Sequence, residues 1–206
     1  MNNLTEKQSV YVYVGSVEYF AENGILPQFA DDDMKKIRNV RVRNEKKAGY
    51  GLLAFAMEKM SVDADAKDCF LSITGKPIHK SFNFSISHSQ GVVALAVSRS
   101  CGVGIDIEPQ KNEKRTEKLL KKMMCEGENA INSLVLWTKK EAVFKCEGKE
   151  KFFKPNKINT MNYSTKSIKF DFEKEEFVLS IAGKKEMDVV FFSAPGGDEI
   201  VFSEIC

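Results

Sequence analysis

The chain has 206 residues, of which 43% are hydrophobic, and its 31 Lys plus Arg against 29 Asp plus Glu give a formal net charge of +2. A chain of this length with 15 Phe can bury a sizeable core, as one large domain or two small ones. The balanced charge gives no support for nucleic-acid binding, so we expect no nucleic-acid partner.

Two features of the sequence bear on its location. The start, MNNLTEKQSVYVYVG, lacks the basic-then-apolar order of a secretion signal, and no stretch approaches the roughly 18 apolar residues of a membrane helix. The five cysteines are odd in number and widely spaced, which fits neither a disulfide framework nor a zinc site. We therefore expect a cytoplasmic protein with no membrane partner, whose cysteines are reduced and structural.

The first half of the chain is predicted to run strand, helix, strands. Valines and tyrosines alternate from residue 10 to residue 14, which is the period of a half-buried strand. Residues 31–60 are predicted to form one helix, with basic residues crowding its beginning. Short strands are then expected over 69–73, 82–87 and 91–98.

The second half repeats this order, with a strand over 102–109, a charged helical stretch over 112–125 and a longer helix over 132–148. Three strands are expected after it, over 167–172, 177–181 and 187–193. We therefore predict a pseudo-duplicated α+β fold, in which each lobe packs a helix on a small antiparallel sheet. The predicted lobes are residues 1–101 and residues 102–206, the second carrying the metal site.

The strand GVGIDIE (102–108) carries two acids on one face. Asp106 and Glu108 alternate with the apolar residues, and their α carbons should lie roughly 6.6 Å apart, close enough for both to bind one cation. The alternative is an edge strand with a solvated acidic face. Gly102 and Gly104 favour the first interpretation, because glycine weakens a strand unless a backbone or ligand comes close.

The segment WTKKEAVFK (137–145) holds the only tryptophan. On a helix, Trp137, Glu141 and Lys145 share one face. Glu141 would supply a third acid if this helix lies across the acidic strand, and Lys140 and Lys145 would then meet an anionic substrate. The alternative is an exposed ion pair between Glu141 and Lys145.

Two further features have both functional and structural interpretations. Ser87 and His88 end the predicted strand FSISHS, where a lone histidine is more often structural, and neighbours on a strand point to opposite faces, which argues against a nucleophile with its base. The basic residues of the first long helix form a solvated face unless they lie beside a phosphate site. They are Lys35, Lys36, Arg38, Arg41, Arg43, Lys46 and Lys47.

Taken in order, GKP (75–77), FSISHS (84–89), GVGIDIE (102–108) and WTKKEAVFK (137–145) resemble the signatures of the 4′-phosphopantetheinyl transferases, in particular the Sfp-type branch. The resemblance implies a magnesium-dependent enzyme of the holo-[acyl-carrier-protein] synthase type. Such enzymes move the 4′-phosphopantetheine group of coenzyme A onto a serine hydroxyl of an acyl or peptidyl carrier protein and release adenosine 3′,5′-bisphosphate.

The same resemblance assigns roles around the reacting pyrophosphate. It implies that Asp106, Glu108 and Glu141 hold magnesium on that group, and that Lys145 and His88 contact it. Glu141 is also the candidate general base for the carrier serine, directly or through water. We therefore expect Glu141, Lys145 and His88 to be the catalytic residues.

For the nucleotide, the resemblance implies that Lys76 and Ser87 help to seat it and that Lys47 binds the 3′-phosphate. The sequence departs from the family at Ser85, where an asparagine is common. It also departs at KKMM (121–124), where the two methionines would offer a soft apolar contact to the carrier helix.

Two other functions remain open from the residues alone. One is a metal-dependent nuclease, although such sites usually place acid and lysine two apart on a strand. The other is a module that binds coenzyme A or a carrier protein without catalysis, although a binder would not need all three acids. In each case we expect a monomer.

Overall fold

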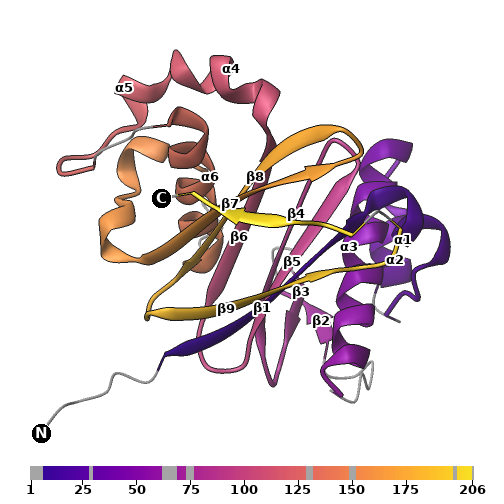
Figure 1. Cartoon of the computed structure of the whole chain (residues 1–206). Coiled ribbons are helices and arrows are strands. Elements are labelled where there is room, and N and C mark those ends of the chain that lie inside the picture. Colours follow the sequence, from indigo (N-terminus) through magenta and orange to yellow (C-terminus); the bar gives the residue numbers. More distant parts are fainter. Residues whose placement is uncertain are drawn as a thin grey trace, which may run out of the picture.

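The structure is a computed structural model in which two sheets pack face to face, with helices on the outer face of each (Figure 1). It describes residues 7–27, 30–61, 69–72, 77–128, 132–148, 152–196 and 199–205. The α+β class predicted from the sequence is confirmed.

The first sheet has the strand order β4-β5-β1-β9. Its strands are β1 (Gln8–Ser16), β4 (Asn83–Ser89), β5 (Val92–Ser98) and β9 (Met187–Ser193). β5 pairs antiparallel with both β1 and β4, whereas β9 runs parallel to β1. Helices α1 (Val17–Asn23), α2 (Ala30–Lys35) and α3 (Val40–Lys59) belong to this side, as does a small ladder of β2 (Cys69–Leu71) and β3 (Pro77–His79).

The second sheet has the order β10-β7-β8-β6 and is antiparallel throughout. Its strands are β6 (Val103–Pro109), β7 (Ser164–Phe172), β8 (Glu175–Gly183) and β10 (Phe202–Glu204). Helix α6 (Ser133–Cys146) covers its outer face. Shorter helical segments lie around it: η1 (Gln110–Asn112), α4 (Glu113–Glu117), α5 (Leu120–Met123), η2 (Pro155–Lys157) and η3 (Thr160–Asn162).

The main hydrophobic core lies between the sheets. It is built from alternate residues of each strand, including Val10, Val12 and Val14 of β1 and Val103, Ile105 and Ile107 of β6, all buried. A second cluster packs α3 against the outer face of the first sheet. The apolar side chains of β6 thus point into the core, and the opposite face of β6 packs against α6.

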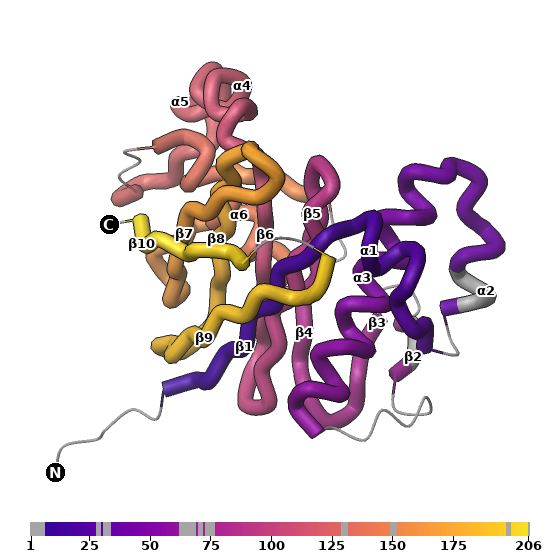
Figure 2. The backbone as a smooth tube through the Cα atoms, turned by 45° about the vertical axis from the view of Figure 1, so that its right-hand side comes forward, coloured from indigo at the N-terminus to yellow at the C-terminus, as the bar shows by residue number. Residues whose placement is uncertain are grey.

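The predicted repeat of element order is visible in the strand pairing. In each half the first strand (β1 or β6) pairs with the last (β5 or β8), and this one pairs with the middle strand (β4 or β7), always antiparallel. One strand does not follow this scheme. β9 was predicted as a strand of the second half, but it lies beside β1 in the first sheet (Figure 2).

The position of β9 has a physical reason. Without it, the outer edge of β1 would leave backbone groups unpaired beside a buried core, which is costly. Met187, Val189 and Phe191 of β9 pack onto that core at the same time. The lobe boundary at residues 101/102 therefore stays a prediction about the order of elements along the chain.

The single helix predicted over 31–60 is wrong, because two helices stand there. Asn39 takes an extended conformation (φ −73°, ψ 117°), and its side chain accepts a hydrogen bond from the Val42 amide at 3.2 Å, which caps the start of α3. The stretch 112–125 is likewise divided into α4 and α5. Strands β3 and β10 were not predicted.

The cysteines that the structure describes, Cys69, Cys101, Cys125 and Cys146, form no disulfide. In the described part of the chain, no helix combines the length and the apolar character needed to cross a bilayer.

Candidate functional site

The site begins where the edge strand β4 of the first sheet meets the edge strand β6 of the second. Ser85 Oγ accepts a hydrogen bond from the Ile105 amide at 3.2 Å, and Ser89 Oγ donates to Glu108 Oε2 at 3.4 Å. With Ser87 between them, these serines occupy alternate positions of β4 and so face β6 together. This serine ladder was missed, although the S-x-S-x-S spacing of residues 85–89 is its signal.

Ser87 belongs to a closed triangle of polar contacts with Asp106 and Lys145. Lys145 Nζ lies 2.7 Å from Asp106 Oδ1 and 3.0 Å from Ser87 Oγ, and Ser87 Oγ donates to Asp106 Oδ1 at 2.9 Å. Asp106 is only 3% exposed, so a solvated acidic face is the wrong interpretation for this residue. Its second oxygen, Oδ2, is buried and has no hydrogen-bond partner in the described part of the chain.

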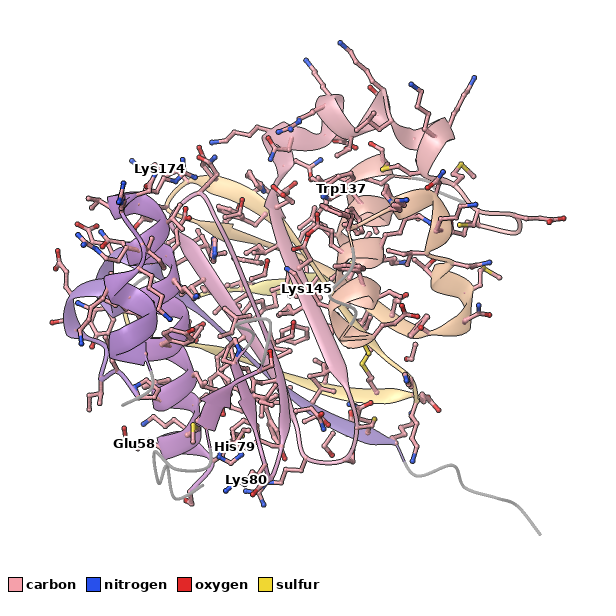
Figure 3. The ribbon with its side chains drawn as sticks, turned by 180° about the vertical axis from the view of Figure 1, so that it is seen from behind. Glu58, His79, Lys80, Trp137, Lys145 and Lys174 are labelled. Carbon is pink, nitrogen blue, oxygen red and sulfur yellow. The ribbon has the colours of Figure 1, made fainter. Side chains whose placement is uncertain are left out.

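The close packing of α6 on β6 depends on Gly104. A Cβ at this position would lie 1.9 Å from the carbonyl oxygen of Ala142, so a larger residue would push the helix away. A 2.7 Å hydrogen bond between Thr138 Oγ1 and Ser180 Oγ also joins the helix to β8. The helix therefore lies across the acidic strand, with Lys145 beside β6 and Trp137 further along the same helix (Figure 3).

Glu141 reaches the same cluster from α6. Burial, followed by the negative charge of Asp106, raises the pKa of its carboxyl to about 8, although the Lys145 ammonium opposes both effects. The interaction of this carboxyl with the Asp106 side chain therefore favours the protonated form of Glu141. Burial raises the pKa of Glu108 too, against a hydrogen bond from Asn112 at 2.8 Å.

These acids fit an open cation site. Among the residues that the structure describes, no three His, Cys, Asp or Glu side chains form a ready metal cluster. However, a divalent ion would replace the proton that the Glu141 carboxyl holds and would give the buried Asp106 Oδ2 a partner. Magnesium suits such an incomplete oxygen set, since it retains waters and is completed by substrate phosphates.

His88 lies on the opposite face of β4 from Ser87. Its Nδ1 is 3.6 Å from Glu45 Oε2 on α3, and its side chain is 40% exposed. Burial lowers the pKa of the imidazole, the Glu45 carboxylate opposes this, and the charge of Lys145 lowers the pKa further. A ligand that extends around the edge of β4 could contact both His88 and Lys145. Glu45 was not anticipated from the sequence.

The two lysines expected at the nucleotide have different outcomes. Lys47 is half-buried on α3. It comes two residues after Glu45, a rotation of about 200°, so the two residues stand on nearly opposite sides of the helix. Its role at the 3′-phosphate stays a prediction. Lys76 lies outside the described residues.

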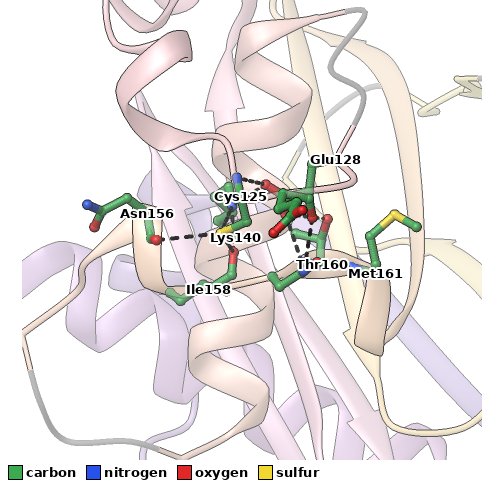
Figure 4. A network of polar contacts seen from close by, with 9 residues as sticks. Cys125, Glu128, Lys140, Asn156, Ile158, Thr160 and Met161 are labelled. Atoms are coloured by element: carbon green, nitrogen blue, oxygen red, sulfur yellow. Dashed lines mark hydrogen bonds and ion pairs between the residues drawn. The ribbon is translucent and has the colours of Figure 1, made fainter.

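Lys140 was expected to meet an anionic substrate, and this is wrong because its ammonium is buried in a separate network (Figure 4). Lys140 Nζ donates to Glu128 Oε2 at 2.6 Å and to the Ile158 carbonyl, and it lies 3.6 Å from Cys125 Sγ. Glu128 also accepts from the Thr160 amide at 2.8 Å. This lysine ties α6 to the chain segments on either side of it.

Comparison with protein-family models gives a match in the second half of the chain. Residues 102–189, which run from β6 through α6 to the start of β9, match the family model described as the 4′-phosphopantetheinyl transferase superfamily. A search of curated proteins found no match. The match covers less than half of the chain, but it includes Asp106, Glu108, Glu141 and Lys145, and it indicates a transferase of the phosphopantetheinyl class.

Proposed function

We propose that this protein transfers the 4′-phosphopantetheine group from coenzyme A to a serine hydroxyl of an acyl or peptidyl carrier protein and releases adenosine 3′,5′-bisphosphate. This makes it a holo-[acyl-carrier-protein] synthase of the Sfp-type branch. One chain supplies every residue that the proposal uses, so it requires only a monomer.

One observation carries the proposal. At the seam between the sheets, Asp106, Lys145 and Ser87 are joined by hydrogen bonds, and the charges of Asp106 and Lys145 act on the Glu141 carboxyl. Phosphoryl transfer to an alcohol needs charge neutralisation and alignment more than a protein nucleophile. A buried carboxylate oxygen without a partner and a lysine that is 28% exposed offer positions for a cation and for an anion side by side.

We assign the roles as follows. Asp106, Glu108 and Glu141 would hold magnesium, which supplies neutralisation of the pyrophosphate charge. Lys145 would donate to a pyrophosphate oxygen while Ser87 and Asp106 hold its ammonium in place. In its ionised form, Glu141 would accept the proton of the carrier serine, directly or through water.

The remaining ligand contacts come from the first half of the chain. His88 would reach the pyrophosphate around the edge of β4, with Glu45 orienting its ring. Lys47 would bind the 3′-phosphate, and Lys76 would help to seat the nucleotide.

One of the two methionines predicted to contact the carrier helix has to be replaced by another residue. Met123 is 1% exposed and cannot touch a partner, whereas Met124 and Leu119 are each 37% exposed. We therefore propose Leu119 and Met124, flanked by the exposed Lys121 and Lys122, as the contact surface for the carrier.

The test is intact-mass measurement of several apo carrier proteins incubated with coenzyme A, magnesium and this protein. A mass increase of one phosphopantetheine on at least one carrier, dependent on magnesium, is the expected result. A carrier-binding module without catalysis would bind a carrier and leave its mass unchanged. Unchanged masses across the panel, with the protein folded, would contradict the proposal.

A further inference from the structure

A cavity of about 780 Å³ lies on the outer face of the first sheet, between the end of α3 and the strands β1 and β9. It lies where α3 ends at Lys59, beside β9 at the edge of the sheet. Cavities of roughly 300–1,000 Å³ are the size that small-molecule sites use.

The cavity is far from the seam of the candidate site. In the first sheet, His88 pairs with Val93 at the beginning of β5. Arg99, which lines the cavity, comes directly after the last residue of the same strand. Arg99 stands six residue steps after Val93, which is a span of roughly 20 Å in an extended chain. Figure 3 shows Glu58, the neighbour of Lys59, at the end of α3 that lies away from Lys145.

Aromatic rings form one wall of the cavity. Tyr13 and Phe192 are opposite each other on β1 and β9, and their rings stack with centroids 5.0 Å apart. Tyr11 stacks on the same Phe192 at 6.4 Å, and Phe55 of α3 meets Tyr13 edge-on at 6.3 Å. Phe192 keeps 38% of its surface exposed, so a flat ligand can stack on it.

The rim of the cavity is basic. Lys7, Lys59, Arg99 and Lys185 come from four separate segments of the chain, and none of the described residues that line the cavity is acidic. Glu186 pairs with Lys7 at 2.8 Å, while Lys59 lies over the Phe55 ring at 5.3 Å and Arg99 Nη2 donates to the Met60 carbonyl at 3.4 Å. A chain with a net charge of only +2 thus gathers four cations around one cavity.

We propose that this cavity binds a small flat aromatic anion, such as a ring that carries a sulfonate, carboxylate or phosphate group. The ring stacks on Phe192 beside Tyr13, and the anion lies among Lys59, Arg99 and Lys185. Stacking alone would accept a neutral ring, so the basic rim provides the selectivity for charge. This inference does not depend on the proposed transfer reaction.

The test uses 8-anilinonaphthalene-1-sulfonate as the probe and its fluorescence as the readout, with the full-length folded protein. Saturable binding is expected, weakened about fivefold or more by Phe192→Ala and by Arg99→Gln, the latter less so at high salt. The matched controls Phe152→Ala and Lys169→Gln change exposed residues elsewhere and should bind as the wild type does. The uncharged analogue N-phenyl-1-naphthylamine should bind more weakly than the sulfonate.

A second variant guards against loss of folding. Ser9 is an exposed residue that lines the cavity, so Ser9→Trp should fill the space and abolish binding without changing the melting temperature. Equal affinity in Phe192→Ala, Arg99→Gln and Ser9→Trp would overturn the proposal. Loss of probe binding in Lys145→Ala would also overturn it, because the probe would then occupy the transfer site.

Discussion

Lys140 and Lys145 stand five residues apart on α6, and each donates to a buried carboxylate at nearly the same distance, 2.6 Å to Glu128 and 2.7 Å to Asp106. Their surroundings differ. Lys140 and Glu128 are 0% and 2% exposed, whereas Lys145 keeps 28% of its surface exposed. Both Glu128 oxygens accept hydrogen bonds, while Asp106 Oδ2 accepts none from the described residues.

The difference separates a structural pair from a functional one. A buried pair whose hydrogen-bonding groups are all satisfied has nothing left for a ligand, so its effect is on the position of the helix. A pair with one unsatisfied oxygen and an accessible ammonium can bind a cation on one side and an anion on the other. We call these the closed pair (Lys140 and Glu128) and the open pair (Lys145 and Asp106).

The largest expected effect is on the closed pair. Lys140→Met leaves the Glu128 carboxylate buried without its ammonium, so the free energy of unfolding should fall by about 3–5 kcal/mol. Urea denaturation measures this. The double variant Lys140→Met with Glu128→Leu should recover most of the loss, and a single variant within about 1 kcal/mol of the wild type would show that the pair is dispensable.

Next in size is the effect of Glu141→Gln beside the open pair. This substitution keeps the shape but removes a carboxylate from the cation site, so turnover at saturating coenzyme A should fall by about 10²-fold or more. The melting temperature without magnesium should not fall, since the wild-type carboxyl already holds a proton near neutral pH. Glu58→Gln, an exposed acid on α3, is the matched control, and wild-type turnover in both variants would exclude Glu141 from the site.

Lys145→Ala should affect binding as well as rate. It removes the cation that faces the pyrophosphate, so KM for coenzyme A should rise and kcat should fall, each by about tenfold. Lys145→Arg should restore only part of the activity, because the guanidinium is bulkier than the ammonium. Steady-state kinetics measures both constants. Wild-type values of KM and kcat in Lys145→Ala would show that the open pair is only a surface contact.

A smaller effect is expected in the pH dependence of stability without metal. The pKa of Glu141 is raised from 4.5 to about 8, so the folded state binds the extra proton between these values and stability should fall as pH rises through this window. Urea titrations in a chelating buffer should show a shallower decline for Glu141→Gln. Parallel curves for the two proteins would mean that Glu141 titrates normally.

The smallest effect is expected for an exposed pair of the same composition. Lys169 Nζ lies 2.9 Å from Glu176 Oε1 on the neighbouring strand, with side chains 34% and 42% exposed. Lys169→Ala should change the free energy of unfolding by only about 0.5 kcal/mol or less, and less still at high salt. A loss as large as that of Lys140→Met would mean that burial does not separate the pairs.

Local patterns in the sequence were enough for much of the fold. The alternation in β1 and β6, and the i, i+4 spacing of Trp137, Glu141 and Lys145, depend on neighbours a few residues away. Asn39 divided the predicted helix because a side-chain cap competes locally with helix continuation. The pairing of β9 with β1 has no local signal, since it joins residues about as far apart as the chain allows.

The same distinction applies to the site. Asp106 and Glu141 could be singled out by residue type and spacing, and the resemblance supplied their roles. The burial of Lys140 could not be foreseen, because its partners Glu128 and Ile158 stand in irregular segments on either side of α6. The sequence KKEA presents Lys139 and Lys140 alike, and only the packed structure separates them.

The most direct test of the open pair is calorimetric titration of coenzyme A into the wild type, Lys145→Ala and Lys169→Ala, each with and without magnesium. We predict that the wild type and Lys169→Ala bind coenzyme A with equal affinity, that both lose most of it without magnesium, and that Lys145→Ala binds at least about tenfold more weakly. Affinity that is independent of both magnesium and Lys145 would contradict the claim that the open pair holds the pyrophosphate.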